Sequence, residues 1–266
     1  MSFCDIVVDA CPRSDVYRTL EHAREIAGEF GADLSVVSYA WPPFSIREAL
    51  VLNAFSVQEQ TQAMEDALTA ARNAFDNVFG ADRKGVGWCS GIGDPNKAMR
   101  DHLLTADLLI TSSSDADACV LPNPAELAIR SGAPVLRLGR QSLKGFGHVL
   151  VAWKASPQAR RAVHDALPLL QRAERVTTVG VGDGVFADRL EAVAEHLRRH
   201  KVKACHRHIS RSEEAVCADL LTLAEREGAN LIVAGISYHS LLTERMLGSV
   251  TREILKSRDM TWFLAQ

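Results

Sequence analysis

The chain has 266 residues, of which 47% are hydrophobic and 24% are charged, so its composition is that of a globular protein and excludes a disordered one. Its 30 Lys and Arg residues nearly balance its 33 Asp and Glu residues, and the formal net charge of -3 gives no overall attraction to nucleic acid or to an anionic membrane. No apolar run reaches the ~20 residues that a membrane helix requires, and the first residues do not resemble a signal peptide. The sequence therefore predicts a cytoplasmic protein with no nucleic-acid or membrane partner.

Short β-branched runs alternate with helical segments along the first half of the chain, which is the pattern of an α/β protein with a parallel sheet. We expect strands at 6–8, 34–37, 86–89, 108–110 and 134–136. Helices are expected from Val16 to Ala27, from Val57 to Phe79, after Pro95, and after Pro122. Cys4, Cys89 and Cys205 lie in apolar strand-like runs, so we expect them to be buried, unreactive thiols.

The second half repeats this order of elements. We expect strands at 149–151, 176–181, 202–205, 231–233 and 262–264. Between them, Ser156 and Pro157 begin one helix, a second covers 187–199, and a third contains Leu220 and Leu223. The segment from Gly139 to Gly147 contains three glycines and few apolar residues, and the linker between the two halves is expected there, at 140–147. The expected domains are therefore 1–139 and 148–266, each a doubly wound fold with a five-stranded parallel sheet.

The two halves differ in length just after their fourth strands. Leu108 corresponds to Leu231, an offset of 123, whereas Pro134 corresponds to Thr261, an offset of 127. The segment between the last two strands is therefore four residues longer in the second half. There, Gly235 follows a strand directly, and Gly248 and Ser249 stand where a helix begins.

This longer segment has features of a phosphate-binding loop. Glycine at 235 allows a tight turn and close approach of a ligand. The backbone amides of Gly248, Ser249 and Val250 and the Ser249 hydroxyl would donate hydrogen bonds to phosphate at the positive end of the helix dipole. The alternative interpretation is that Gly235 only forms a turn and Ser249 only caps the helix.

At these residues the chain resembles the universal stress protein family, in its form with two tandem domains. Gly235, Tyr238 and the Gly248-Ser249 pair match the spacing of the family's loop, and His239-Ser240 and the run Leu247–Thr251 are similar to the family as well. The resemblance covers essentially the whole chain. It implies two domains of universal stress and adenine nucleotide alpha hydrolase-like fold, a role in stress response and, as in some family members, binding of ATP or another adenine nucleotide.

Two departures from the family pattern bear on this expectation. Tyr238 replaces the middle glycine of the loop, and a non-glycine residue there resists a positive φ angle. Lys154 takes the position where nucleotide-binding members have an aspartate at the end of the first strand; it would pair with a phosphate, or it is a solvated strand-end residue. In the first half Asp9 and Cys11 are both candidates for this position.

The first half has no glycine in the corresponding loop, and Asp115 and Asp117 would repel phosphate. Asn123 can still cap the short helix. We therefore expect the first half to be a structural partner without a nucleotide loop.

We expect neither a metal site nor a catalytic site. His196, His200, His206 and His208 have spacing compatible with zinc, but basic residues interleave them and oppose a cation. Ser112, Ser113 and Ser114 lack the glycine elbow of a serine hydrolase.

Three functions remain open at this point. The first is a non-enzymatic stress-response protein that binds an adenine nucleotide or small anion through Gly235, Gly248, Ser249, Val250, Lys154 and His239. The second is a scaffold or dimerisation protein of the same fold without nucleotide, and the third is a weak ATP hydrolase, for which His239 is the only titratable candidate. Because the terminal strand at 262–264 needs cover at the sheet edge, an intramolecular pseudo-dimer and a homodimer are both open.

Overall fold

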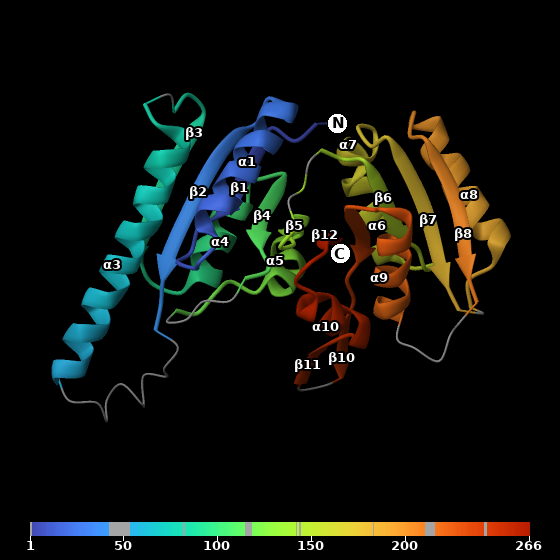
Figure 1. Ribbon diagram of the computed structural model, residues 1–266. Helices are drawn as coiled ribbons and strands as arrows, with labels where there is room; N and C mark the ends of the chain where they lie inside the picture. The colour runs from blue at the N-terminus through green and yellow to red at the C-terminus, as the bar shows by residue number, and fades with distance from the viewer. Residues whose placement is uncertain are drawn as a thin grey trace. The chain divides into compact units, whose positions relative to one another are not determined.

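The computed structural model describes residues 2–42, 54–81, 83–114, 119–141, 143, 145–182, 184–210, 216–241 and 244–266. Figure 1 shows strands alternating with helices through these ranges, which confirms the predicted α/β class. The chain forms two compact units. One covers Phe3–Leu127, and the other covers Ala128–Gln266 together with the first two residues.

The first unit contains four parallel strands in the order β3-β2-β1-β4. These are β1 (Asp5–Asp9), β2 (Asp33–Ala40), β3 (Val86–Ile92) and β4 (Leu108–Ser112). The helices that connect them are α1 (Val16–Phe30), α3 (Ala54–Phe79) and α4 (Pro95–Leu103), and α5 (Pro124–Ser131) begins in this unit. All predicted elements of this region are present.

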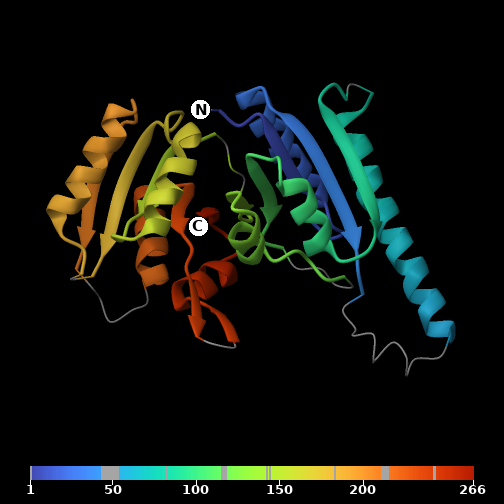
Figure 2. The same cartoon turned by 180° about the vertical axis from the view of Figure 1, so that it is seen from behind.

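Helices cover both faces of the first sheet. Figures 1 and 2 show α1 and α3 on one face and α4 on the other. Helix α1 packs on the sheet because Leu20, Ala23 and Ala27 recur on its buried side, and it ends at Gly31, whose φ of 67° is readily adopted by glycine. Helix α4 begins after Asp94, which accepts a hydrogen bond from the Asn96 backbone N–H.

The second unit contains six strands in the order β5-β12-β9-β6-β7-β8. These are β5 (Val135–Leu138), β6 (His148–Ala152), β7 (Arg175–Val181), β8 (Ala204–Ile209), β9 (Leu231–Gly235) and β12 (Thr261–Ala265). The helices are α6 (Pro157–Asp165), α7 (Leu167–Leu170), α8 (Ala187–Arg199), α9 (Val216–Glu227) and α10 (Ser249–Lys256). Figures 1 and 2 show α6 and α8 on one face of this sheet and α9 and α10 on the other.

Strand β5 belongs to the first half of the sequence but pairs antiparallel with β12 of the second half. This pairing covers the terminal strand, and Trp262 and Phe263 are fully buried. The Gly139 N–H donates to the Thr261 hydroxyl over 3.0 Å, so the chain after β5 also packs in the second unit. The units thus divide after Leu127, whereas the sequence places the boundary between the repeats at 140–147; that boundary stays a prediction about the repeat.

Two expectations about the sheets are wrong. The strand expected at 202–205 runs from Ala204 to Ile209. Cys4 and Cys205 are exposed and Cys89 is half-buried, because Cys89 and Cys205 lie in β3 and β8, each an outermost strand of its sheet, and Cys4 precedes β1.

No helix within the described ranges is both long and apolar enough to cross a membrane.

Candidate functional site

In each unit the direction in which successive strands are added to the sheet reverses at the first strand of the repeat. In the first unit β1 lies between β2 and β4, and in the second unit β6 lies between β7 and β9. Ligands of open parallel sheets bind beyond the carboxyl ends of the strands at such a reversal. The two candidate ligand sites are therefore at the carboxyl ends of β1 and β4 and at those of β6 and β9.

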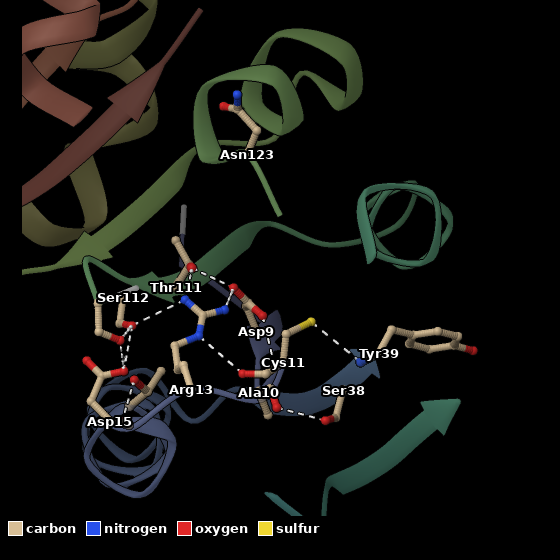
Figure 3. Close-up of polar contacts among 12 residues, drawn as sticks. Asp9, Ala10, Cys11, Arg13, Asp15, Ser38, Tyr39, Thr111, Ser112 and Asn123 are labelled. Carbon is tan, nitrogen blue, oxygen red and sulfur yellow. Dashed lines mark hydrogen bonds and ion pairs between the residues drawn. The ribbon is translucent and has the colours of Figure 1, made fainter. Parts of the chain in front are cut away.

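In the first unit a buried ion pair occupies this place (Figure 3). The Asp9 carboxylate is at the end of β1 and bonds to the Arg13 guanidinium; the exposed fractions of the two side chains are 0% and 2%. The Asp9 carboxylate also accepts hydrogen bonds from the Thr111 hydroxyl at 2.6 Å and from the Cys11 backbone N–H at 3.0 Å. Asp9 therefore has protein partners for both of its oxygens.

Arg13 fills the space beyond the carboxyl ends of β1 and β4 and forms further hydrogen bonds there. Its Nε donates to the Cys11 carbonyl at 3.2 Å, and its Nη1 donates to the Ser112 hydroxyl at 3.3 Å. Burial lowers the pKa of Arg13 and is the largest single influence, but Asp9, together with Cys11 and Asp15, raises the pKa above its usual value. The guanidinium thus stays charged where a ligand of the crevice would lie.

Asp15 completes the polar cluster beside the start of α1. Its carboxylate accepts hydrogen bonds from Ser112 at 2.9 Å, from Arg18 at 2.8 Å and from Ser114. Although burial raises the pKa of Asp15, the bonds from Ser114, Arg18 and Ser112 lower it below its usual value. Ser112 and Ser114 therefore serve as donors to a carboxylate.

Cys11 lies on the other side of Asp9, and its sulfur accepts a hydrogen bond from the Tyr39 backbone N–H over 3.4 Å. Burial and the nearby Asp9 raise the pKa of the Cys11 thiol well above its usual value, so the thiol stays protonated. Of the two candidates for the end of the first strand, Asp9 is the last residue of β1 and Cys11 follows two residues later.

The start of α5 in the first unit is capped by the side chain of Asn123. The Asn123 side-chain oxygen accepts hydrogen bonds from the backbone N–H groups of Ala125 and Glu126, both at 3.1 Å. This confirms the predicted cap. It also means that the side chain of Asn123 occupies the position that an anion would take at this helix.

In the second unit, Gly235 is in close contact with protein. A Cβ atom at this position would lie 2.5 Å from the Gln158 carbonyl carbon and 2.6 Å from the Ala159 nitrogen in α6. Glycine at the end of β9 is therefore required for α6 to pack against the sheet. This packing role was not expected from the sequence.

The segment expected to be a phosphate loop contains a β-hairpin. Strand β10 (Tyr238–Leu241) pairs antiparallel with β11 (Glu244–Leu247), with Tyr238 opposite Leu247 and His239 opposite Met246. His239 is thus in β10, and its side chain lies outside the described part of the structure. No hairpin was expected here from the sequence.

After the hairpin, α10 begins at Ser249, and its N-cap is Gly248, which has no side chain with which to cap the helix. The Gly248 N–H donates to the Ser237 carbonyl at 3.3 Å, which places the start of α10 close to the end of β9. The first N–H groups of a helix have no acceptor within the helix, and those of Ser249 and Val250 are in this position. The side chain of Ser249 lies outside the described part of the structure.

Lys154 is exposed two residues beyond the end of β6. Because β6 and β9 are neighbours in the sheet, Lys154 and the start of α10 follow adjacent carboxyl ends. The structure thus brings Gly235, Gly248, Ser249, Val250 and Lys154 to the same edge of the second sheet.

The other end of α10 is bound by an arginine whose role was not expected from the sequence. Arg137 of β5 donates to the carbonyl oxygens of Ser257 at 2.6 Å, Leu255 at 2.8 Å and Ile254 at 3.4 Å. A cation at a helix C-terminus stabilises the helix dipole. The only signal in the sequence is one charged residue within an apolar strand.

The histidines of α8 and β8 have contacts of their own. The His196 and His200 rings pack edge to face, with 4.7 Å between their centroids. The His206 ring lies 2.6 Å from the Glu191 carboxylate, and the His208 ring lies 3.0 Å from the Gly182 carbonyl oxygen. Among the described residues no group of three or more His, Cys, Asp or Glu side chains is arranged to hold a metal ion.

Comparison with known proteins identifies the fold. No protein-family model and no curated protein matches the chain. A universal stress protein from Archaeoglobus fulgidus has a similar structure, with a TM-score of 0.69 and 15% identity over 98% of each chain. A putative universal stress protein from Pseudomonas aeruginosa UCBPP-PA14 is similar with a TM-score of 0.58 and 13% identity, over 99% of this chain and 93% of that one. A functionally unknown protein from Pseudomonas aeruginosa PAO1 has a TM-score of 0.56 and 13% identity, over 99% and 92% of the two chains. The chain thus has the fold of these universal stress proteins over nearly its whole length.

Proposed function

We propose that this chain is a stress-response protein that binds an adenine nucleotide or another small anion in its second unit and does not catalyse a reaction. The observation that carries the proposal is the start of α10 at Gly248, an N-cap without a side chain, beside the end of β9. A helix start with free N–H donors at the carboxyl edge of a parallel sheet suits a phosphate. The likeness in fold supports the stress-response role.

The charges around this helix start favour an anion. The first turn of α10 contains no acidic residue, and Lys154 is exposed at the end of the neighbouring strand. In the proposed site the N–H groups of Gly248, Ser249 and Val250 and the Ser249 hydroxyl face the phosphate, and Lys154 supplies a positive charge. His239 flanks the site from β10, and Gly235 lets α6 and β9 approach each other behind it.

A scaffold without nucleotide is the second candidate, and the hairpin favours it. Tyr238 and Leu247 pair across β10 and β11, so the segment between Gly235 and Gly248 bonds to itself. In that case the α10 start is covered by water, and the chain acts through its surfaces, as a pseudo-dimer of its two halves or as a homodimer. A weak ATP hydrolase is the third candidate, with His239 as its titratable group.

Isothermal titration calorimetry with ATP and with AMP tests the proposal. We expect binding to be lost in Gly248→Val, because the added side chain stands over the α10 amides, and to be weakened in Ser249→Ala and Lys154→Ala. The matched control is Asn123→Ala at the start of α5, which should leave binding unchanged. Absence of binding at millimolar ATP would favour the scaffold, and phosphate release that depends on Gly248 would favour the hydrolase.

Tyr238→Gly separates the first two candidates further. If the tyrosine in β10 restricts access to the α10 start, glycine at 238 should strengthen ATP binding. Pyrophosphate and adenosine, titrated separately, show whether the phosphate or the base supplies the affinity. Binding of adenosine alone, unaffected by Gly248→Val, would contradict the assignment to α10.

A further inference from the structure

Strand β3 is the outermost strand of the first unit's sheet and pairs with β2 only (Figure 1). On its inner side the Leu34 N–H donates to the Gly85 carbonyl at 2.7 Å, and the Gly93 N–H donates to the Ala40 carbonyl at 3.0 Å. Since backbone groups alternate along a strand, odd-numbered residues of β3 bond to β2. The backbone N–H and C=O groups of Trp88, Ser90 and Ile92 therefore point away from the sheet.

This edge lacks the charged residues and the proline that commonly protect edge strands. Its seven residues, Val86–Ile92, include no charge and no proline. The outermost strand of the second unit, β8, contains His206, Arg207 and His208, and two such strands would repel one another. Charge and proline are the usual means of preventing edge-to-edge pairing. Strand β3 is thus available for pairing, whereas β8 is protected.

The sequence around β3 reads almost the same in both directions about Cys89. About Cys89, Val86 mirrors Ile92 and Gly87 mirrors Gly91, whereas Trp88 and Ser90 differ in size. Outside the strand, Gly85 is matched with Gly93, and Lys84 is matched with Asp94, which has the opposite charge. Both charged side chains are exposed, and within the described ranges Lys84 forms no ion pair.

We propose that β3 is a dimerisation edge, on which a second copy of this chain places its own β3 antiparallel about a two-fold axis at Cys89. In this register Trp88 lies opposite Ser90 of the second copy, and the two residues exchange both backbone hydrogen bonds. Lys84 lies near Asp94 of the second copy at each end. A two-fold contact requires a surface that is complementary to itself, and the mirrored sequence meets this requirement.

One face of the paired strands is already covered within each copy. The Trp88 ring packs on Phe75 of α3 with 4.9 Å between centroids, and Arg72 lies over the Trp88 ring. On the opposite face Gly87 and Gly91 have no side chains, and the Tyr39 hydroxyl contacts the Cys89 sulfur at 3.6 Å. Because glycines flank Cys89, the two Cys89 side chains would face each other without crowding.

The register makes a specific prediction about Cys89. Its backbone groups bond to β2, so Cys89 and its counterpart form a non-hydrogen-bonded pair with Cα atoms about 4.5 Å apart. This separation lies within the range of a disulfide. Diamide, which accepts two electrons and two protons from a pair of thiols, should therefore link two chains through Cys89.

The experiment combines analytical ultracentrifugation with diamide cross-linking of the full chain. We expect the 29.0 kDa chain to sediment as a dimer, and the cross-linked species to disappear in Cys89→Ser but to persist in Cys205→Ser, the matched exposed cysteine of β8. A monomer at all concentrations, or a cross-link that depends on Cys205, would overturn the proposal.

Two substitutions test the pairing without cysteine chemistry. Ser90→Pro removes an outward N–H but no bond to β2, and should raise the dimer dissociation constant roughly tenfold or more, since two bonds are lost across the axis. His208→Pro on β8 is the control and should leave the constant unchanged. The proposal fails if Ser90→Pro folds and dimerises normally.

Charge reversal at the ends gives an independent check if Ser90→Pro does not fold. Lys84→Glu places like charges opposite each other and should weaken the dimer roughly threefold at low salt, an effect that salt suppresses. Adding Asp94→Lys to that variant should restore association. No change in either variant would contradict the register. The proposal is independent of nucleotide binding by α10.

Discussion

The carboxyl edges of the two sheets differ in what occupies them. In the first unit Arg13 fills the space beyond β1 and β4 and bonds to Asp9, and Asn123 caps the following helix. In the second unit, α10 starts without a side-chain cap, and exposed Lys154 follows the adjacent strand. One fold thus supports both a crevice closed by its own side chains and a helix start that can receive an anion.

The largest expected effect comes from opening the closed crevice. Arg13→Ala leaves the Asp9 carboxylate buried without a counter-ion, and we expect the free energy of unfolding to fall by about 3–5 kcal/mol in urea titrations. Lys154→Ala, at the comparable exposed strand end of the second unit, should change it by less than about 0.5 kcal/mol. Replacing both members of the pair, as in Asp9→Leu with Arg13→Met, should recover much of the loss. Equal stability of Arg13→Ala and the native chain would show that the pair is not buried in solution.

The next effect concerns the clamp on α10. Arg137→Met removes the donors to the carbonyls of Ile254, Leu255 and Ser257. We expect a loss of about 1.5–3 kcal/mol, the range for a hydrogen bond to a charged group. Hydrogen exchange should accelerate in α10 more than in α1. If exchange in α10 stays slow, the helix is held by packing, and the arginine is dispensable.

Gly235 separates a packing role from a ligand role. Gly235→Ala forces a Cβ atom against the α6 backbone, and overpacking of this kind costs about 1–3 kcal/mol even without ligand. Gly184→Ala is the control, since a Cβ atom there would meet nothing within 4 Å. Thermal unfolding of the two variants should differ accordingly. A neutral Gly235→Ala variant with impaired nucleotide binding would return this glycine to the ligand role.

The smallest effect is a difference in acid response between the units. Burial and the nearby Arg175 lower the pKa of His148 in the second unit, although Glu227 opposes them. The unfolded chain therefore binds a proton at this residue more readily, so the stability from neutral His148 is present above pH 6.5 and lost as pH falls below it. The pKa of Asp15 in the first unit is lowered from 3.8, so its contribution is lost only at more acidic pH.

Hydrogen exchange at pH 7 and pH 5, corrected for intrinsic rates, measures this difference. Protection should fall in β6 and α9 before it falls in β1 and α1. His148→Gln should flatten the response of the second unit. Parallel loss in both units would show that His148 does not set the order.

Much of the fold could be predicted because hydrophobic periodicity reports local structure. Leu20, Ala23 and Ala27 recur at helical spacing in α1, and the run Leu231–Val233 is a buried inner strand of the second unit's sheet. Edge strands were predicted less well. Cys89 and Cys205 lie in apolar runs but are accessible, because nothing in a local pattern distinguishes an outermost strand from a central one.

The contents of the two edges could be predicted only in part. The start of α10 at Gly248 and Ser249 follows from local glycine and helix signals. The partners of Arg13 are Asp9, four residues away, and Thr111 and Ser112, almost a hundred residues away, so their meeting depends on the β1–β4 pairing. The packing of Gly235 on α6 is likewise a contact between distant segments.

The stoichiometry of ATP binding tests the central difference between the units most directly. Equilibrium dialysis of the full chain at saturating ATP should give one nucleotide per chain. The value should stay at one in Asn123→Ala, in the first unit, and fall to zero in Gly248→Val. Two nucleotides per chain, or one that persists in Gly248→Val, would contradict the account.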